Sequence, residues 1–197
     1  MKWLLTALCI CLVTAGLLQA AEKSKGEAMF EVMHERKSVR NFTGAPVSKA
    51  DLERILRAGM SAPTARNQQP WSFVAVTDRK TLDSLAVGLP YAKMLSKAGA
   101  AIIVCTQPAK AAGSSKDFAI IDASLAGENI LLAVEALGLG AVWTAAYPDN
   151  DKMTHVRSVL GIPKDVIPLN VIPVGVPTGE DKPKDKYHKE MIHWEKW

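Results

Sequence analysis

Apolar residues recur at helical spacing in three stretches of the chain. Residues 48–59 open with a Ser-x-x-Asp cap and carry apolar side chains three and four positions apart before Gly59, which suits a helix stop. Residues 122–139 are the longest helical candidate. Because small or apolar residues occupy most of its sides, we expect burial within the domain or between subunits. A shorter helix is predicted over residues 150–160, with Asn150 as its cap.

Three further runs have the composition of strands. Residues 70–76 combine β-branched and aromatic side chains behind a proline, and residues 101–106 are continuously apolar, which favours a central strand. Residues 169–176 predict a third strand, in which Pro173 indicates an edge position or a bulge. Helices and strands mixed in this order predict an α+β or α/β sandwich with one core.

The first 21 residues have the pattern of a targeting segment. A single lysine precedes a long uncharged run that ends in small residues at Ala20 and Ala21. This pattern predicts a secretory signal peptide over residues 1–21, followed by a domain over residues 22–197. We therefore expect an exported, periplasmic protein with no membrane attachment after cleavage. The alternative is an uncleaved leader that anchors the protein in the membrane.

Composition narrows the class of protein. The 197 residues are 48% hydrophobic and 22% charged, which excludes collagen-like, low-complexity and wholly disordered chains and suits one domain. The formal net charge of +4 is too small to indicate a nucleic-acid binder without a clustered patch. Removal of the leader leaves Cys105 as the one cysteine, so no internal disulfide is possible, and its apolar neighbours predict a buried thiol.

The last 18 residues, 180–197, differ from the rest. Five lysines are balanced by five acidic residues, and Trp194 and Trp197 are large apolar groups that a free tail would leave in water. We therefore expect an extended arm that lies on another surface, such as that of a neighbouring subunit.

The familiar catalytic motifs are missing from the sequence. It has no G-x-S-x-G, no P-loop, no G-x-G-x-x-G, no C-x-x-C and no H-E-x-x-H. The four histidines are not spaced to share a helix face, so we expect no metal site. An enzyme with so few catalytic side chains needs a cofactor for the difficult step.

Three segments of the sequence carry side chains suited to binding a cofactor. Residues 34–42 hold three cations and a serine, and the planar guanidinium of arginine matches phosphate oxygens. A solvated basic turn would have the same local composition. Residues 61–71 are rich in amide side chains and suit the edges of a flat heterocycle. Residues 138–148 hold small side chains that let backbone N–H groups approach a ligand.

The order of these segments resembles the nitroreductase family of FMN-dependent oxidoreductases. The resemblance covers residues 31–197 and rests on R-K-S-V-R-N-F, S-A-P-T-A-R-N-Q-Q-P-W, D-A-S-L-A-G-E-N-I-L-L, G-L-G-A-V-W and P-V-G-V-P with the K-P-K-D-K-Y-H that follows. It implies an α+β, nitroreductase-like sandwich. Its central mixed sheet would be flanked by helices, in a single domain with an extended C-terminal arm.

The resemblance also implies a set of cofactor-binding residues, none of them catalytic, because the flavin itself carries the chemistry. The implied phosphate and ribityl contacts are Arg36, Lys37, Ser38 and Arg40, with Lys184 and Lys186 closing on the phosphate. The implied ring contacts are Pro63, Thr64 and Asn67, together with the backbone of Ala145 and Ala146 near the flavin N5.

The activity implied is hydride transfer from NADH or NADPH, through flavin N5, to a nitroaromatic, quinone or similar acceptor by a ping-pong mechanism. The implied assembly is a homodimer with the flavin at the subunit interface. Two alternatives remain open: an exported flavin-binding electron-transfer module without efficient NAD(P)H turnover, and a cofactor-free interaction protein that uses the basic turn and the arm.

Overall fold

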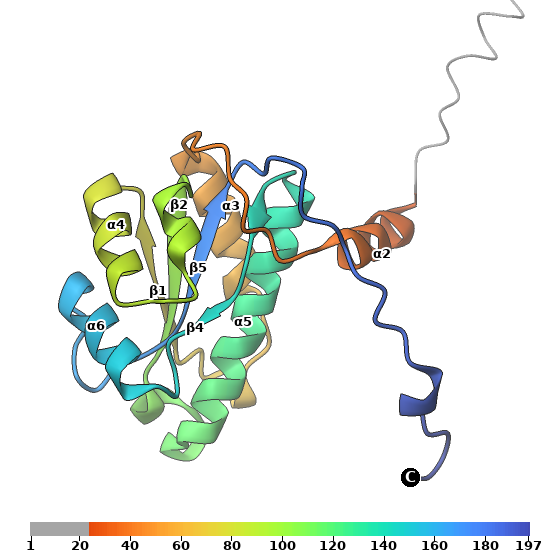
Figure 1. Ribbon diagram of the computed structural model, residues 1–197. Helices are drawn as coiled ribbons and strands as arrows, with labels where there is room; N and C mark the ends of the chain where they lie inside the picture. Colours follow the sequence, from red (N-terminus) through yellow and green to blue (C-terminus); the bar gives the residue numbers. More distant parts are fainter. Residues whose placement is uncertain (1–23) are drawn as a thin grey trace, which may run out of the picture. The chain divides into compact units, whose positions relative to one another are not determined.

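A central sheet with helices on both faces forms the body of the protein (Figure 1). The structure is a computed structural model that describes residues 24–197, so the expected leader at residues 1–21 lies outside the described residues. The chain divides after Met33 into two compact units. Helix α2 (Lys25–Glu35) begins in the first, and residues 34–197 form the second.

The sheet has five strands: β1 (Trp71–Val76), β2 (Ala100–Thr106), β3 (Gly140–Ala141), β4 (Thr144–Ala145) and β5 (Ile167–Gly175). Their order is β1-β2-β5-β3, and β4 also pairs with β5. All of these pairs are antiparallel. The resemblance implied a mixed sheet. Within residues 24–197, the one parallel pairing is an isolated bridge between Ser38 and Ala141.

Four helices cover the two faces of the sheet: α3 (Lys49–Met60), α4 (Arg79–Val87), α5 (Lys116–Ala136) and α6 (Asn150–Leu160). Short 3-10 turns occur at Ala65–Asn67, Lys93–Ser96, Pro108–Lys110, Ala112–Ser114 and Lys189–Met191. Helices α3 and α5 pack on one face, and α4 and α6 on the other (Figure 1). Alternate residues of β2 join the two cores: Ile102 packs with α3 and α5, and Ile103 with α4 and α6.

The predicted helices form, but several of their ends differ from expectation. Helix α5 begins at Lys116, six residues before the predicted start at 122, and ends at Ala136 rather than at 139. The hydroxyl of Ser48 accepts the Asp51 N–H at 3.0 Å and caps α3 as predicted. Gly59, however, does not end that helix. A Cβ there would lie 2.8 Å from Ile130 of α5, so the glycine permits close helix packing. Helix α6 is capped by Asp149 rather than Asn150.

The strand containing Pro173 is central, so the expectation of an edge position was wrong. Strand β5 lies between β2 on one side and β3 and β4 on the other. The ladder on the second side pairs Val171 with Thr144 and Val174 with Ala141. The proline, which has no N–H to donate, therefore lies opposite the break between β3 and β4.

An extended segment, residues 38–43, brings the two ends of the body together. The Val39 N–H donates to the Ala141 carbonyl at 2.9 Å, which holds the segment beside β3. On its other side the Thr43 N–H donates to the Val176 carbonyl at 2.9 Å, and the Thr178 N–H donates to the Asn41 carbonyl at 3.0 Å. These hydrogen bonds hold the chain after β5 beside the N-terminal segment that contains the basic residues.

The end of the chain is exposed. Every residue from 182 to 197 is exposed, including Trp194 at 80% and Trp197 at 99% of full accessibility. No helix in residues 24–197 combines the length and the apolar character needed to cross a bilayer.

Candidate functional site

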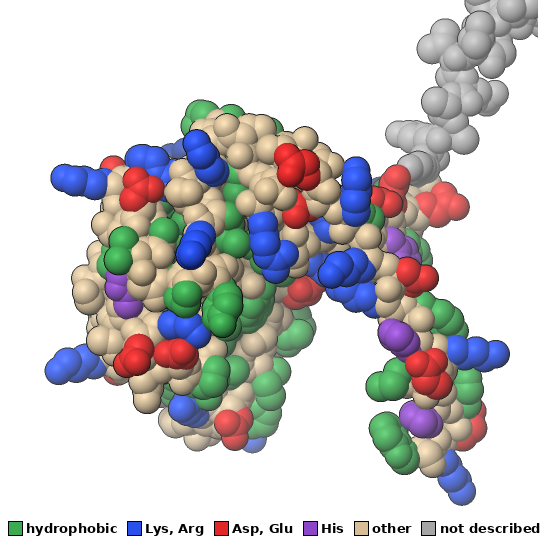
Figure 2. Space-filling view, in the orientation of Figure 1, with side chains coloured by type: hydrophobic (Ala, Val, Ile, Leu, Met, Phe, Trp, Pro, Cys, Tyr) green, Lys and Arg blue, Asp and Glu red, His purple; other side chains and the backbone are tan. Residues whose placement is uncertain are grey.

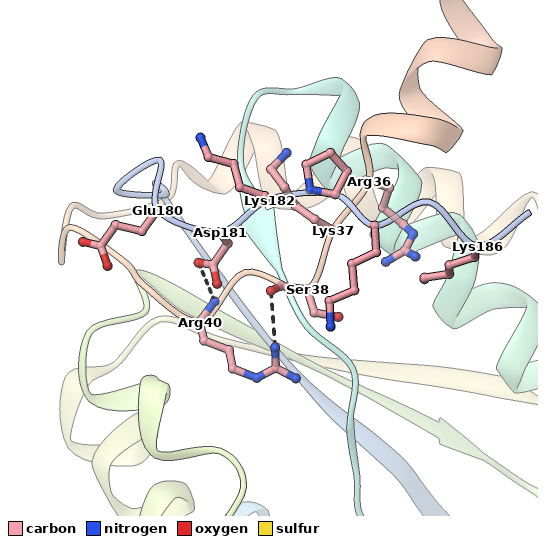
Figure 3. Close-up of a pocket in the computed structure, with 10 residues that line it drawn as sticks. Arg36, Lys37, Ser38, Arg40, Glu180, Asp181, Lys182 and Lys186 are labelled. Atoms are coloured by element: carbon pink, nitrogen blue, oxygen red, sulfur yellow. Dashed lines mark hydrogen bonds between the residues drawn. The ribbon is translucent and has the colours of Figure 1, made fainter.

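A cavity of about 560 Å³ lies where the basic segment meets the start of the C-terminal arm. Its lining comes from two stretches of sequence: Arg36, Lys37, Ser38, Arg40, Glu180, Asp181, Lys182, Pro183, Lys184 and Lys186. Lys and Arg side chains gather on the surface here (Figure 2), and the close-up shows the two stretches facing each other (Figure 3). The structure thus brings together the six residues predicted to hold a phosphate.

The cavity is electropositive. Six of its lining residues are basic and two are acidic, and two glutamates of α5 offset part of that charge. Glu128 lies 3.5 Å from Arg36, and Glu135 lies 2.8 Å from Lys37. Counting these four acids against the six cations leaves an excess of two positive charges, which matches the nearly dianionic charge of a phosphate monoester.

Asp181 organises the backbone beneath the cavity. Its Oδ2 accepts hydrogen bonds from the N–H groups of Arg40 at 3.0 Å and Asn41 at 3.1 Å, and from the Asn41 side chain at 3.3 Å. The Arg40 guanidinium donates to the Ser38 carbonyl at 3.4 Å (Figure 3). Both Ser38 and Arg40 are exposed, so the hydroxyl and the guanidinium are available to a ligand.

The predicted ring contacts lie elsewhere. Pro63, Thr64 and Asn67 are not among the residues that line the cavity. Their loop is tightly built: Arg66 and Asn67 have φ angles of 53° and 56°, unusual for residues with a side chain. The Asn67 N–H donates to the Thr64 carbonyl at 3.0 Å, and the buried Asp122 of α5 accepts the Ala65 N–H at 2.9 Å.

The predicted backbone contacts at the flavin N5 also lie outside the cavity lining. Ala145 and Ala146 are neighbours in sequence but differ in exposure. Ala146 is fully buried, and its N–H donates to the Leu169 carbonyl at 3.1 Å. Ala145 is exposed, which makes it the more accessible of the two positions.

Two carboxylates of this region were missed by sequence analysis. Asp181 has no local signal, because it lies in a tail where acids and lysines alternate and its partners are about 140 residues away. Asp122 has a signal that could have been used: it is the one acidic residue in the stretch 118–127 of α5, whose other residues are apolar or small. Glu180, Lys182 and Pro183 also line the cavity without having been predicted.

The buried thiol predicted for Cys105 is confirmed. The side chain is 1% exposed in β2, and burial raises its pKa to about 12. A thiol in that state is not a nucleophile at neutral pH. No group of three or more His, Cys, Asp or Glu side chains within residues 24–197 is arranged to hold a metal ion.

Comparison with known proteins agrees with this architecture. The Nitroreductase family model matches residues 33–88 and 84–176. An Archaeoglobus fulgidus protein named "Putative NADH dehydrogenase/NAD(P)H nitroreductase" is 38% identical over 174 residues, which cover 87% of this chain and 99% of that protein. A Bacillus subtilis FMN reductase (NAD(P)H) is 26% identical over 178 residues, covering 81% of this chain and 70% of that protein.

A solved structure shows the same fold. The crystal structure from Bacteroides thetaiotaomicron that carries the name "Putative NADH dehydrogenase/NAD(P)H nitroreductase" has a TM-score of 0.81 against this chain. The two sequences are 48% identical, and the match covers 86% of this chain and 98% of the other.

Proposed function

Because the chain belongs to the nitroreductase family, we propose that it is an FMN-dependent oxidoreductase that takes its electrons from NADH or NADPH. The observation that carries this proposal is the electropositive cavity. Its cations come from both ends of the body, and Asp181 holds the two segments together.

The donor set fits FMN. Arg36, Arg40 and Lys184 present charged donors to the cavity, and Ser38 adds a neutral hydroxyl. Charge-assisted hydrogen bonds of this kind contribute about 1.5–3 kcal/mol each. The volume also lies within the 300–1,000 Å³ typical of ligand pockets. These residues would hold the phosphate end of the cofactor.

When bound, FMN would supply the redox chemistry, a transfer of hydride from NAD(P)H to a nitroaromatic, quinone or similar acceptor, which we propose to be ping-pong. The residues of the chain bind the cofactor, orient it and screen it from water. Between β2 and α5, residues 107–115 form two short 3-10 turns rather than a covering helix. We therefore expect loose selection among acceptors, and a strong preference for one bulky acceptor would contradict this.

The protein is proposed to act as a homodimer, with the flavin at the subunit interface. The loop of Pro63, Thr64 and Asn67 does not line the cavity of its own chain, and we propose that the same loop of a second chain completes the site. Helix α5 also exposes apolar side chains on one side, with Phe118 at 47%, Ile121 at 53% and Leu125 at 42%. An exposed apolar stripe of this kind is typical of a subunit contact.

The homodimer is tested by light scattering and flavin content. Ile121→Lys places a charge in the exposed stripe of α5 and is expected to give a monomer that retains little FMN. Val87→Lys is the matched control, because Val87 is 85% exposed on α4, on the opposite face of the sheet. A dimeric Ile121→Lys variant with full flavin content would contradict the proposed interface.

Absorbance spectroscopy tests the activity. The purified protein is expected to be yellow, to bleach rapidly with NADH or NADPH in the absence of oxygen, and to regain its colour when a quinone is added. Yellow protein that does not bleach would support the flavin-binding electron-transfer module instead. Colourless protein that takes up no added FMN would support the cofactor-free interaction protein.

We also propose export. The leader at residues 1–21 would be removed near Ala20 or Ala21 and would place the protein in the periplasm. Cell fractionation followed by N-terminal sequencing tests this, and a protein that retains Met1 in the membrane fraction would support the anchored alternative.

A further inference from the structure

Two neighbouring cations of the cavity have different partners. The ammonium group of Lys37 lies 2.8 Å from Glu135 and 3.2 Å from the Glu35 carbonyl, and the Lys37 and Glu135 side chains are 20% and 15% exposed. The Arg36 guanidinium lies 3.5 Å from Glu128, and these side chains are 19% and 51% exposed. The two cations are therefore equally buried, but Lys37 is paired closely with a screened carboxylate and Arg36 more distantly with a solvated one.

Exposure alternates along residues 37–40: Lys37 is half-buried, Ser38 exposed, Val39 buried and Arg40 exposed. Val39, two residues on, is 1% exposed and packs closely against Gly140, where an added Cβ would lie 2.6 Å from the valine. Ser38 and Arg40 are exposed and line the cavity. Lys37 also lines the cavity, but its ammonium group is bound to Glu135 of α5, whereas no carboxylate in residues 24–197 is paired with the Arg40 guanidinium, which donates to the Ser38 carbonyl.

These observations give Lys37 a different role from the phosphate contact that the sequence implies. Resting on the proposed function, we propose that Lys37 is a positioning residue: Glu135 holds its ammonium group, and this pair orients Ser38 and Arg40 toward the cavity. The phosphate of FMN is then gripped by Arg36, Arg40 and the C-terminal lysines, and Lys37 makes no bond to it.

The affinity of FMN relative to riboflavin separates the two roles, because riboflavin lacks the phosphate. Both affinities are measured by fluorescence titration of the full-length protein after its flavin has been removed. Lys37→Met is expected to weaken both ligands alike, leaving their ratio within about twofold of wild type. Arg40→Met is expected to lower the ratio about tenfold or more, as loss of a charge-assisted phosphate bond requires.

A paired variant controls for misfolding. Lys37→Met leaves the Glu135 carboxylate without its partner in a screened position, whereas Lys37→Met/Glu135→Gln removes both charges at similar volume. The double variant is expected to regain part of the thermal stability lost in Lys37→Met and to keep the wild-type ratio of affinities.

The outcomes distinguish this inference from the proposed function. If Lys37→Met, or the double variant, lowers the ratio as much as Arg40→Met, Lys37 is a phosphate contact and the inference is overturned, although the proposed function stands. If the wild-type protein binds neither flavin, the proposed function fails and the inference fails with it.

Discussion

One carboxylate oxygen of Asp181 accepts the backbone N–H of Arg40 at 3.0 Å, joining residues 141 positions apart. The same oxygen accepts the N–H of Asn41. A carboxylate beside a site for an anion would oppose binding unless its charge were used elsewhere. Here it satisfies the peptide groups of the segment that presents Arg40, so it supports the cation's position.

Asp181→Ala is expected to release the start of the arm from this segment. The free energy of unfolding should fall by on the order of 1 kcal/mol, the usual value of one hydrogen bond, and the dissociation constant for FMN should rise about tenfold. Thermal melts and flavin titration measure the two effects. Asp181→Asn, which keeps an acceptor oxygen, should lie between Asp181→Ala and wild type.

Glu180 provides the control for that change. It also lines the cavity and is exposed, but the N–H groups of residues 40 and 41 donate to Asp181 and not to it. Glu180→Ala is expected to leave stability unchanged and to bind FMN as well as wild type or slightly better, since a like charge has been removed. Equal losses in Asp181→Ala and Glu180→Ala would contradict the role given to Asp181.

Charge reversal at both ends of the cavity should remove the cofactor. Arg36→Glu/Lys184→Glu replaces two cations with anions, one from each segment, and also places a new carboxylate near Glu128. The affinity for FMN is expected to fall by more than about a hundredfold, from the loss of two charge-assisted contacts. Flavin absorbance after gel filtration measures retention.

The same change in net charge away from the cavity should have no such effect. Lys110 and Lys164 are exposed and do not line the cavity, so Lys110→Glu/Lys164→Glu is the matched control. Full retention of pigment by Arg36→Glu/Lys184→Glu would show that the phosphate is bound elsewhere. Equal loss in both double variants would point to net charge rather than to specific contacts.

Local pattern was sufficient to predict elements whose cause is local. The Ser48 cap was predictable because its hydroxyl acts within three residues of itself. The left-handed Gly161 that ends α6 is a local signal of the same kind. The continuously apolar run of β2 indicated a central strand, since neither face meets water. Helix α4 was overlooked, although Asp78 caps it in the same way that Ser48 caps α3.

Long-range pairing could not be predicted in this way. Lys37 and Glu135 are 98 residues apart, and the sequence pattern around either residue does not predict that the two are paired. Composition alone therefore made Lys37 look equivalent to Arg36 and Arg40. Six of the residues that the resemblance implied line the cavity, but the pairing of Lys37 with Glu135 of α5 became visible only in the structure.

Gly59 shows how one residue supports two interpretations. A glycine near a helix end predicts a stop, yet here a Cβ would meet Ile130 Cγ1 at 2.8 Å and the Ala126 carbonyl at 3.4 Å. Gly59→Ala gains up to about 1 kcal/mol of helix propensity and loses about 1–3 kcal/mol through overpacking of α3 against α5. We expect net destabilisation in urea unfolding, and Ile130→Ala, which removes the clashing Cγ1, should cost less stability in the Gly59→Ala protein than in wild type.

Replacement of a glycine by alanine should not lower stability where the added Cβ has open space. A Cβ at Gly26 of α2 would have Ser24 Oγ at 3.9 Å as its nearest neighbour, an ordinary contact. Gly26→Ala is therefore expected to be neutral or slightly stabilising. If Gly59→Ala were also neutral, the close approach of α3 and α5 would not be the reason for glycine at that position.

Burial of the Cys105 thiol makes the free energy of unfolding depend on pH in the alkaline range. Burial raises the thiol pKa from 9.0 to about 12 in the folded state, so below pH 9 both states are protonated and the thiol adds no slope. Above pH 9 the unfolded chain loses the proton first. The free energy of unfolding should then fall by about 1.4 kcal/mol per pH unit up to about pH 12.

Because lysines and tyrosines titrate in the same range, the measurement is a difference between two proteins. Urea unfolding of wild type and Cys105→Ala is compared at several pH values above 9. The variant is expected to be less stable at neutral pH, from the small cavity it creates in the core, and to lose stability less steeply with pH. Parallel profiles for the two proteins would show that the thiol ionises as readily when folded as when unfolded, and that β2 is open to water at this position.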